Sequence, residues 1–437
     1  MVLRIKKRTQ SQWLVLYAFA LPFAFSFLID LLHLPSFIKY TVDAALIVLL
    51  FLAYLNKRIV LDPLVLDLMR VVLVFFAITI IGLFLEYQSI VYYLWGLRNN
   101  FRYFIFFAMC TMVLKQEDAD FGMRLMDGLF YINVVVTLYQ VLVLKVHQDR
   151  VGGIFGTSRG CNGFTNIYLM IIVTWYMLRY MCNKVSLLQM ALQCGLSLGI
   201  AAVAELKMFF IEFVLITALA ALMTKFSFRK FGVIILAVAG LVMGLQIMQI
   251  LFPHFGNWFT LDSIVEYSSS ETGYTNANDV NRLSAIPIAW NRFLDTWPRK
   301  LFGLGLGNCD YSSNFDFLTS PFYRNYGQLN YLWFSSSFLI LETGLVGLLV
   351  YVFFFFRMYR AAKIVEKNEP EKSIYCMMAR IMSLMALVLF MYNSSLRMEC
   401  AYMFFFVLAL PFLPKSSTGG DREETGMSVN EDGGSHQ

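Results

Sequence analysis

Long apolar stretches recur along nearly the whole chain, and short polar turns separate them. A stretch of about 18 or more apolar residues can cross roughly 30 Å of hydrocarbon as a helix. The runs are continuous and lack the two-residue alternation of barrel strands. A window of about 19 residues predicts about twelve spans, centred near Phe23, Ile47, Phe75, Phe104, Val135, Ile172, Leu196, Val214, Ala239, Leu341, Leu384 and Phe405. The pattern therefore predicts an all-α, polytopic membrane protein.

One connection is much longer than the others and runs from about Pro253 to Leu329. Loops of this length are usually functional or disordered. Between Asp279 and Trp297 apolar residues recur at helical spacing, so we expect an amphipathic helix folded onto the membrane surface. The chain then divides into helices one to nine (1–252), a large exterior loop (253–329), helices ten to twelve (330–414) and a polar, disordered tail (415–437).

The charges indicate how the chain is threaded. The net charge is +6, and Lys and Arg gather in alternate turns and beside the tail. This distribution is the positive-inside pattern, which places both termini in the cytoplasm and the long loop outside the cytoplasmic membrane. The segment from Trp13 to Leu32 lacks a small-residue cleavage site and is longer than the apolar part of a signal peptide, so we interpret it as a retained first span.

Composition and motifs mainly exclude classes of protein and of site. Of the 437 residues 59% are hydrophobic and only 15% are charged, which is too little polar surface for a soluble domain. The sequence contains no GxxxxGK[ST], GxGxxG, HExxH or GxSxG motif, so we expect neither a nucleotide cofactor nor a metal. Seven cysteines show no CxxC spacing. A disulfide between Cys161 and Cys309, both in exterior loops, is one reading, and two unpaired thiols is the favoured one.

Two arginines lie within the fourth predicted span. Arg98 and Arg102 are one helical turn apart and share a face. Arginine within the membrane is costly and faces either a polar cavity or a partner. The alternative to a ligand is therefore pairing with a carboxylate such as Glu86 or Glu342. Most of the other embedded ionisable residues are interpreted as structural; they are Arg70, Glu212, Arg380 and Glu399.

Further candidate cations lie in the exterior turns. Glu205 and Lys207 occupy the turn AVAELKMFF, where they either face a shared external cavity or form a plain interfacial turn. Arg159 follows the Gly-rich run GGIFGTS, whose backbone could approach a phosphate or could simply be flexible. Arg282 and Arg292 lie on the amphipathic stretch, either at a site or on a solvated face. Because guanidinium forks match phosphate oxygens, these residues suggest a lipid-linked pyrophosphate.

Several short motifs resemble the O-antigen polymerase and O-antigen ligase superfamily. The segment NRLSAIPIAWNRFLDTWPRKLFGLGLGNCDY is similar to the family's pattern of an Arg, a Trp-containing helix and a run of apolar–Gly pairs. ETGLVGLLVYV is similar to the start of its next span, and GGIFGTSRGCNGFTNIYLM to an earlier Gly- and Asn-containing loop. The resemblance covers the order of segments along nearly the whole chain.

This resemblance implies a fold similar to the membrane-embedded GT-C glycosyltransferases and a metal-independent transfer outside the cytoplasmic membrane. A glycan would move from undecaprenyl pyrophosphate to a hydroxyl of a second glycan, beside a flippase and a chain-length regulator. Carried over by position, Arg282 corresponds to the loop arginine that holds pyrophosphate, Lys207 to the cation of the preceding turn and Arg159 to the basic residue of the earlier loop. These three are the predicted catalytic residues; Arg292, Glu205, Arg98 and Arg102 are predicted to bind substrate.

One departure from the family pattern favours a polymerase over a ligase. Ligases carry a His–Asn pair before the acidic-Gly span start, and here that stretch reads LNYLWFSSSFLILETG. The expected product is an O-antigen, capsule or exopolysaccharide. The alternatives are a ligase-type transferase and a flippase or transporter of lipid-linked sugars, although no internal repeat supports a transporter. The general base stays unassigned among His254, Glu266, Glu271 and Asp279.

Overall fold

The computed structural model describes residues 8–55, 61–158, 160–225, 229–251 and 279–415, and these residues form helices and turns without a strand. The helices before the long loop are α1 (Gln10–Ser26), α2 (Thr41–Leu55), α3 (Pro63–Leu85), α4 (Ile90–Val113), α5 (Gln116–Leu142), α6 (Cys161–Met181), α7 (Leu187–Val203), α8 (Lys207–Met223) and α9 (Arg229–Leu251). Those after it are α11 (Ala285–Ile288), α12 (Trp297–Phe302), α13 (Pro321–Tyr326), α14 (Ser335–Asn368), α15 (Ser373–Tyr392) and α16 (Ala401–Ala409).

The prediction of an all-helical, polytopic membrane protein is confirmed in its coarse form. By length and composition, 7 helical segments in the described chain can cross a membrane. They are Gln10–Leu31, Ser36–Leu55, Pro63–Leu85, Gln116–Leu142, Cys161–Met181, Ser335–Asn368 and Pro370–Tyr392. The larger number of about twelve spans stays a prediction.

Apolar side chains cover both the outside and the centre of the bundle. Ile47 of α2 is 67% exposed and Phe84 of α3 is 71% exposed, as suits a surface in contact with lipid tails. The short helix α16 is apolar on every side, and each of its residues is at most 1% exposed. A helix that is hydrophobic all round belongs in a core. Accordingly α16 packs against α1, α4, α6 and α15.

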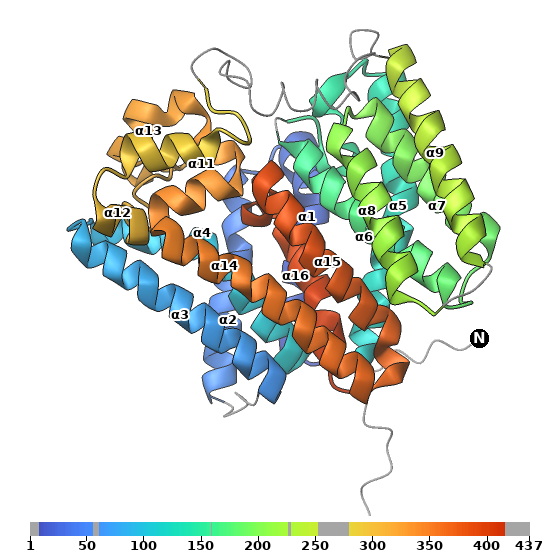
Figure 1. Cartoon of the computed structure of the whole chain (residues 1–437), viewed down its shortest axis with the longest axis horizontal. Helices are drawn as coiled ribbons and strands as arrows, with labels where there is room; N and C mark the ends of the chain where they lie inside the picture. The colour runs from blue at the N-terminus through green and yellow to red at the C-terminus, as the bar shows by residue number, and fades with distance from the viewer. Residues whose placement is uncertain (1–7, 56–60, 159, 226–228, 252–278, 416–437) are drawn as a thin grey trace, which may run out of the picture.

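The helices form two groups on either side of this core. In Figure 1, α2, α3, α4 and α14 lie on the left, α5 to α9 lie on the right, and α15 and α16 run between them. Two names are used below. The cap is the described segment 279–334, which carries α11, α12 and α13. The cap end is the end of the bundle that touches the cap, and the tail end is the opposite one, where the described chain ends at Lys415.

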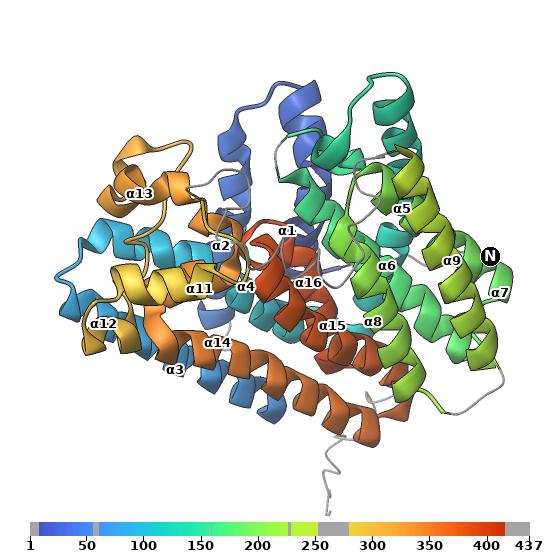
Figure 2. The ribbon, with the colours of Figure 1, turned by 45° about the horizontal axis from the view of Figure 1, so that its top comes forward.

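The cap packs on α3 and α14, and both views place it beside them (Figures 1 and 2). One contact between them is a pair of hydrogen bonds that Arg299 of α12 donates to Glu86, at the end of α3, with N···O distances of 2.7 and 2.8 Å. These hydrogen bonds raise the pKa of Arg299 above its usual value, although partial burial opposes them. The guanidinium therefore stays charged, and the cap is tied to the membrane helices by a bidentate ion pair.

Two loop predictions have mixed outcomes. The helical spacing after Asp279 is confirmed, but the helix is short: α11 and the π-helical turn that continues it end at Phe293. The start of the loop (253–278) and the tail beyond 415 lie outside the described residues. Cys161 and Cys309 are both free and buried, so the favoured reading of unpaired thiols is confirmed.

Candidate functional site

Three alternate glycines join the cap to the membrane helices. Gly303, Gly305 and Gly307 have φ values of +77°, +93° and +88°, which side chains with a Cβ rarely adopt. A Cβ on Gly307 would lie 1.9 Å from the carbonyl oxygen of Tyr92 in α4. The side-chain nitrogen of Gln88 donates to the carbonyl of Leu306 at 2.6 Å. The run therefore lies directly against the backbone that begins α4.

The same run fits into a kink of α14. Gly344 has φ +64° inside this helix, and a Cβ there would lie 2.4 Å from the backbone of Leu301. Conversely, a Cβ on Gly303 would lie 2.4 Å from the backbone of Glu342. The buried Glu342 carboxylate accepts the Cys309 backbone N–H at 3.0 Å. These contacts explain why a Gly run and an acidic-x-Gly span start occur together, and we call them the glycine lock (303–309 with 342–344).

The glycine lock fixes Asp310 at the edge of a charged cluster. Asp310 is 5% exposed, and one oxygen accepts from the Asn99 side chain of α4 at 2.7 Å. The same oxygen lies 3.8 Å from Arg397, in the turn between α15 and α16. Asp310 thus connects the cap to α4 and to the last turn of the fold. A buried carboxylate in this position holds cations at the cap end of the bundle.

Arg98 is fully engaged with protein groups. It donates to one oxygen of Asp43 in α2 at 3.0 and 2.6 Å, and to the Asn99 side-chain oxygen at 2.7 Å. The guanidinium also lies over the rings of Tyr40 and Trp95. With its donors turned to Asp43 and Asn99, Arg98 serves mainly to place the other members of the cluster.

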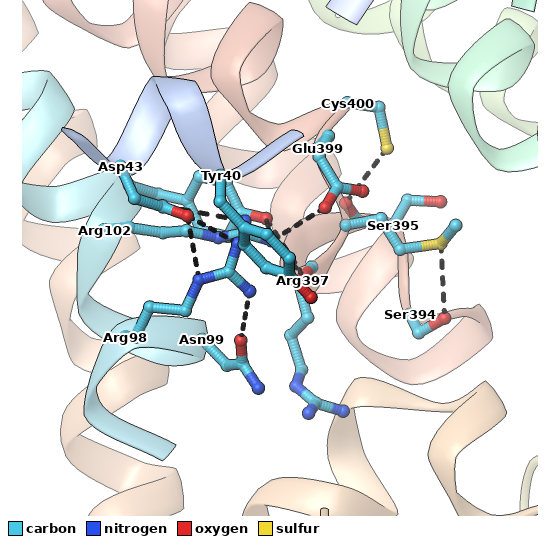
Figure 3. Close-up of polar contacts among 12 residues, drawn as sticks. Tyr40, Asp43, Arg98, Asn99, Arg102, Ser394, Ser395, Arg397, Glu399 and Cys400 are labelled. Carbon is cyan, nitrogen blue, oxygen red and sulfur yellow. Dashed lines mark hydrogen bonds and ion pairs between the residues drawn. The ribbon is translucent and has the colours of Figure 1, made fainter. Parts of the chain in front are cut away.

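Arg102, one turn further along α4, keeps part of its donor capacity. It is 6% exposed, and Nη2 donates to Tyr103 at 2.5 Å and to Glu399 at 3.4 Å (Figure 3). Its Nη1 lies 4.0 Å from Asp43, too far for a hydrogen bond. Among the described residues, neither Nε nor Nη1 has a hydrogen-bond acceptor, although both are buried. Such donors are costly unless a ligand satisfies them.

Arg397 is the least engaged cation of the cluster. Its guanidinium lies over the ring of Phe338 at 3.0 Å, and its ion pair with Asp310 is long at 3.8 Å. The guanidinium donates no hydrogen bond to a side chain or carbonyl of the residues that the structure describes, and its Nε is buried. Figure 3 shows the side chain extending away from Glu399. Arg102, Arg397, Asp43, Asp310 and Glu399, with Arg98 and Asn99, form what we call the arginine cluster.

The cluster lies below the level of the cap. After α16 one further 3-10 turn ends at Phe412, so the helix rises only about 18 Å from Ala401. This rise is well short of the roughly 30 Å of a bilayer core. The turn that holds Arg397 therefore lies deeper in the bundle than the ends of the longer helices, next to Asp310 of the cap. Arg102 is likewise twelve residues into α4, which corresponds to about 18 Å of helix.

Arg282, the predicted pyrophosphate-binding residue, lies close to this cluster. Its guanidinium is over the rings of Tyr392, at 4.2 Å, and Phe334, at 5.7 Å. Phe334 is the N-cap residue of α14, and Phe338, over which Arg397 lies, is in its first turn. Arg282 and Arg397 therefore both contact the start of this helix. The structure thus brings together Arg282, Arg98 and Arg102 of the seven predicted site residues.

The remaining predicted residues lie elsewhere. Glu205 and Lys207 form a 3.1 Å ion pair at the turn between α7 and α8, in the other group of helices. Arg292 lies over Phe293 and Tyr326, within the aromatic packing of the cap. Arg159 is outside the described residues. Of the candidate bases, Asp279 accepts from Asn330 at 3.3 Å, and the others are not described.

The partners of the two embedded arginines differ from those considered in the sequence. The predicted pairing of Arg98 and Arg102 with carboxylates is confirmed, but the carboxylates are those of Asp43 and Glu399. Glu86 binds Arg299, and Glu342 binds the Cys309 backbone. The sequence reasoning also missed Arg397. One feature of the sequence could have indicated Arg397. It lies in a short exterior turn, and the positive-inside pattern leaves exterior turns poor in Lys and Arg.

The arginine cluster is suited to binding a phosphate-bearing group. Guanidinium N–H groups that lack acceptors match phosphate oxygens, and surrounding carboxylates hold the guanidinium planes in place. In the part of the chain that the structure describes, no group of three or more His, Cys, Asp or Glu side chains could hold a metal ion. Comparison with protein-family models and with curated proteins found no match to this sequence.

Proposed function

We propose that this protein is a polymerase that joins lipid-linked oligosaccharide repeat units into a surface polysaccharide. The substrate would be an oligosaccharide on undecaprenyl pyrophosphate, presented at the outer face of the cytoplasmic membrane. In this proposal α1 to α9, α14 and α15 cross the bilayer, and α16 completes the twelfth crossing together with the turn before it. The cap lies outside and both termini lie in the cytoplasm. The fold would then be of the GT-C kind that the sequence resemblance implies.

The observation that carries the proposal is the pair of incompletely bonded arginines beneath the cap. Arg102 and Arg397 each have buried N–H groups that find no acceptor among the described residues. A pyrophosphate with a prenyl chain needs such donors next to hydrocarbon, and apolar helices surround them here. Arg282 adds a third guanidinium at the N-cap of α14, over Phe334.

The proposed reaction uses these cations to stabilise a leaving group. A hydroxyl oxygen of the acceptor glycan bonds to the anomeric carbon of the donor glycan, and the bond from that carbon to the pyrophosphate oxygen breaks. Undecaprenyl pyrophosphate leaves with the electron pair, and the guanidinium groups stabilise the charge that develops on it. Because pyrophosphate is already a good leaving group, positioned cations can suffice.

We assign Glu399 as the group that takes the proton of the acceptor hydroxyl. Asp43 accepts both hydrogen bonds from Arg98 on one oxygen, and its other oxygen is buried out of contact with solvent. Asp310 accepts from Asn99 and from the Tyr311 backbone, and its side chain is only 7% exposed. Glu399 accepts from Arg102 at 3.4 Å, and its side chain is 17% exposed. It therefore combines spare acceptor capacity with access, as a base requires. The interpretation of Glu399 as structural is replaced by this assignment.

The proposal is tested with purified protein and one defined undecaprenyl-pyrophosphate-linked repeat unit. We expect a ladder of longer glycans and one released undecaprenyl pyrophosphate for each bond formed. Transfer to a different acceptor without a ladder would indicate the ligase-type reaction. Movement of intact substrate between leaflets without a new glycosidic bond would indicate a flippase, and either result would overturn the proposal.

A further inference from the structure

A second polar cavity lies at the tail end, far from the arginine cluster. It has a volume of about 370 Å³ and is bordered by the first turns of α5, the end of α6 and the start of α15. Its lining combines carboxylates, cations and two aromatic rings. Along α15, from Tyr375 to Tyr392, the two regions are separated by about 26 Å. The cavity is thus not part of the proposed polymerisation site.

The three carboxylates of this cavity already have partners. Asp120 accepts a hydrogen bond from the Tyr375 hydroxyl, and Asp127 accepts from the Tyr176 hydroxyl at 2.5 Å. Glu371 forms an ion pair with Lys415 at 2.5 Å. None of these partners is one of the cations that line the cavity. The cavity therefore holds charges of both signs, but the acidic side chains are in direct contact with other groups than the lining cations.

Those cations are Arg124, Arg179 and Lys184. Arg124 donates from Nε to the Asp120 backbone carbonyl at 3.2 Å, which uses one of its five N–H groups. No Asp or Glu of the described ranges lies within 4.0 Å of the charged nitrogens of these three residues. Three cations without direct ion pairs around one cavity have N–H groups that an anion can engage, beside carboxylates that already have other partners.

Two stacked aromatic rings, which we call the aromatic floor, lie beneath Arg179. The rings of Trp175 and Tyr375 are stacked, with centroids 5.6 Å apart and an interplanar angle of 16°. The Arg179 guanidinium lies 5.0 Å from the Trp175 ring. Stacking orients the guanidinium plane while leaving its N–H edge for a ligand. Trp and Tyr at the end of a membrane helix also suit the level of lipid headgroups.

We propose that this tail-end cavity binds a phosphate group, held by Arg179, Lys184 and Arg124 above the Trp175–Tyr375 floor. The phosphate would come from an anionic lipid headgroup or from a soluble phosphate compound. Under the proposed topology this end faces the cytoplasm, whose leaflet carries anionic lipid. The inference does not depend on the proposed polymerase activity, because it concerns the opposite end of the molecule.

The test measures binding to the purified full-length chain with two probes. The lipid arm adds dioleoyl-phosphatidylglycerol and counts bound lipid by native mass spectrometry, with phosphatidylcholine as the zwitterionic comparison. The soluble arm titrates inorganic pyrophosphate by calorimetry. The variant carries Arg179→Gln and Lys184→Gln. Its matched control carries Arg360→Gln and Lys363→Gln, which remove two exposed cations of α14 that do not line the cavity.

We expect the Arg179/Lys184 variant to weaken binding of at least one probe by about tenfold or more, with no change in the control. Loss in the lipid arm alone identifies a headgroup, loss in the soluble arm alone identifies a free phosphate compound, and loss in both identifies the phosphate group itself. Binding of both probes within twofold of wild type, or an equal loss in the control, would overturn the inference. Thermal unfolding, compared with Arg179→Lys, verifies that the variant is folded.

Discussion

A substitution at Glu399 can distinguish its proposed role as a proton acceptor from a role in ion pairing alone. The change Glu399→Gln keeps the size of the side chain and removes the proton acceptor. We expect the rate of chain extension to fall on the order of 100-fold or more while substrate affinity changes little, because a base acts in the transition state. Initial rates over a range of lipid-linked substrate concentrations measure the two effects.

The matched control for this change is Asp316→Asn. Asp316 is an acidic residue of the cap whose side chain is 84% exposed and pairs with Arg324. We expect it to extend chains at the wild-type rate, since an exposed ion pair contributes little. If Glu399→Gln instead weakened substrate binding and left the maximal rate intact, Glu399 would be a residue that positions Arg102, and the base would have to be sought elsewhere.

The sequence predicts some of the cluster and not the rest, for a physical reason. Spacing alone places Arg98 and Arg102 on one face of a helix, and burial of charge predicts that they have partners. Which carboxylates serve as partners depends on contacts between residues 55 or more positions apart, which no local pattern encodes. The same holds for Arg397, whose ion pair with Asp310 joins residues on either side of α14 and α15.

The glycine lock makes a prediction at the level of elements. Gly307→Ala places a Cβ 1.9 Å from the Tyr92 carbonyl in a backbone conformation with φ +88°. The cap run or α4 must then shift, at a cost of about 1–3 kcal/mol, and Asp310 moves with it. We expect a lower unfolding temperature and strongly reduced chain extension. Thermal unfolding in detergent and the extension assay measure both.

A second glycine provides the control for this substitution. Gly195 lies within α7, and a Cβ there meets nothing within 4 Å. Alanine is the better helix former, so Gly195→Ala should leave stability unchanged or raise it slightly. Equal stability and activity in the two variants would show that the close contact of Gly307 with α4 is not required.

The elements themselves were largely predictable because long apolar runs have few alternatives in a membrane. The kink at Gly344 was not, since ETGLVGLLVYV reads as one uninterrupted span. Its cause is the Gly303–Gly307 run packed against it from a different part of the sequence. The resemblance motif identified both halves of this contact, although only the structure relates them in space.

The arrangement of the whole molecule rests on the proposed threading, which cysteine labelling can test. Ser313→Cys adds an exposed thiol to the cap, and Lys363→Cys adds one to α14 towards the tail end. Six of the seven native cysteines are buried, so they give little background. In intact cells we expect a membrane-impermeant maleimide to label Ser313→Cys, and Lys363→Cys only after the membrane is opened. Labelling in the reverse order would place the cap in the cytoplasm.

The arginine cluster lies on the cap side of the bundle, and the tail-end cavity lies at the opposite end. α15 contributes to both, with Tyr375 at the cavity and Tyr392 beside Arg282. The sequence indicated the polarity of the two ends through its charge distribution, but not the depth of the cluster. That depth follows from the length of α16, which is shorter than a full span. The hydropathy of 401–412 does not show where this helix begins or ends.

The central claim is that guanidinium groups beneath the cap stabilise a departing pyrophosphate. The most direct measurement is the single-turnover rate of undecaprenyl pyrophosphate release for wild type, Arg397→Ala and the cap control Arg324→Ala, whose arginine pairs with Asp316 at the surface. We predict a rate on the order of 100-fold lower for Arg397→Ala and an unchanged rate for Arg324→Ala. Wild-type release from folded Arg397→Ala would contradict the account.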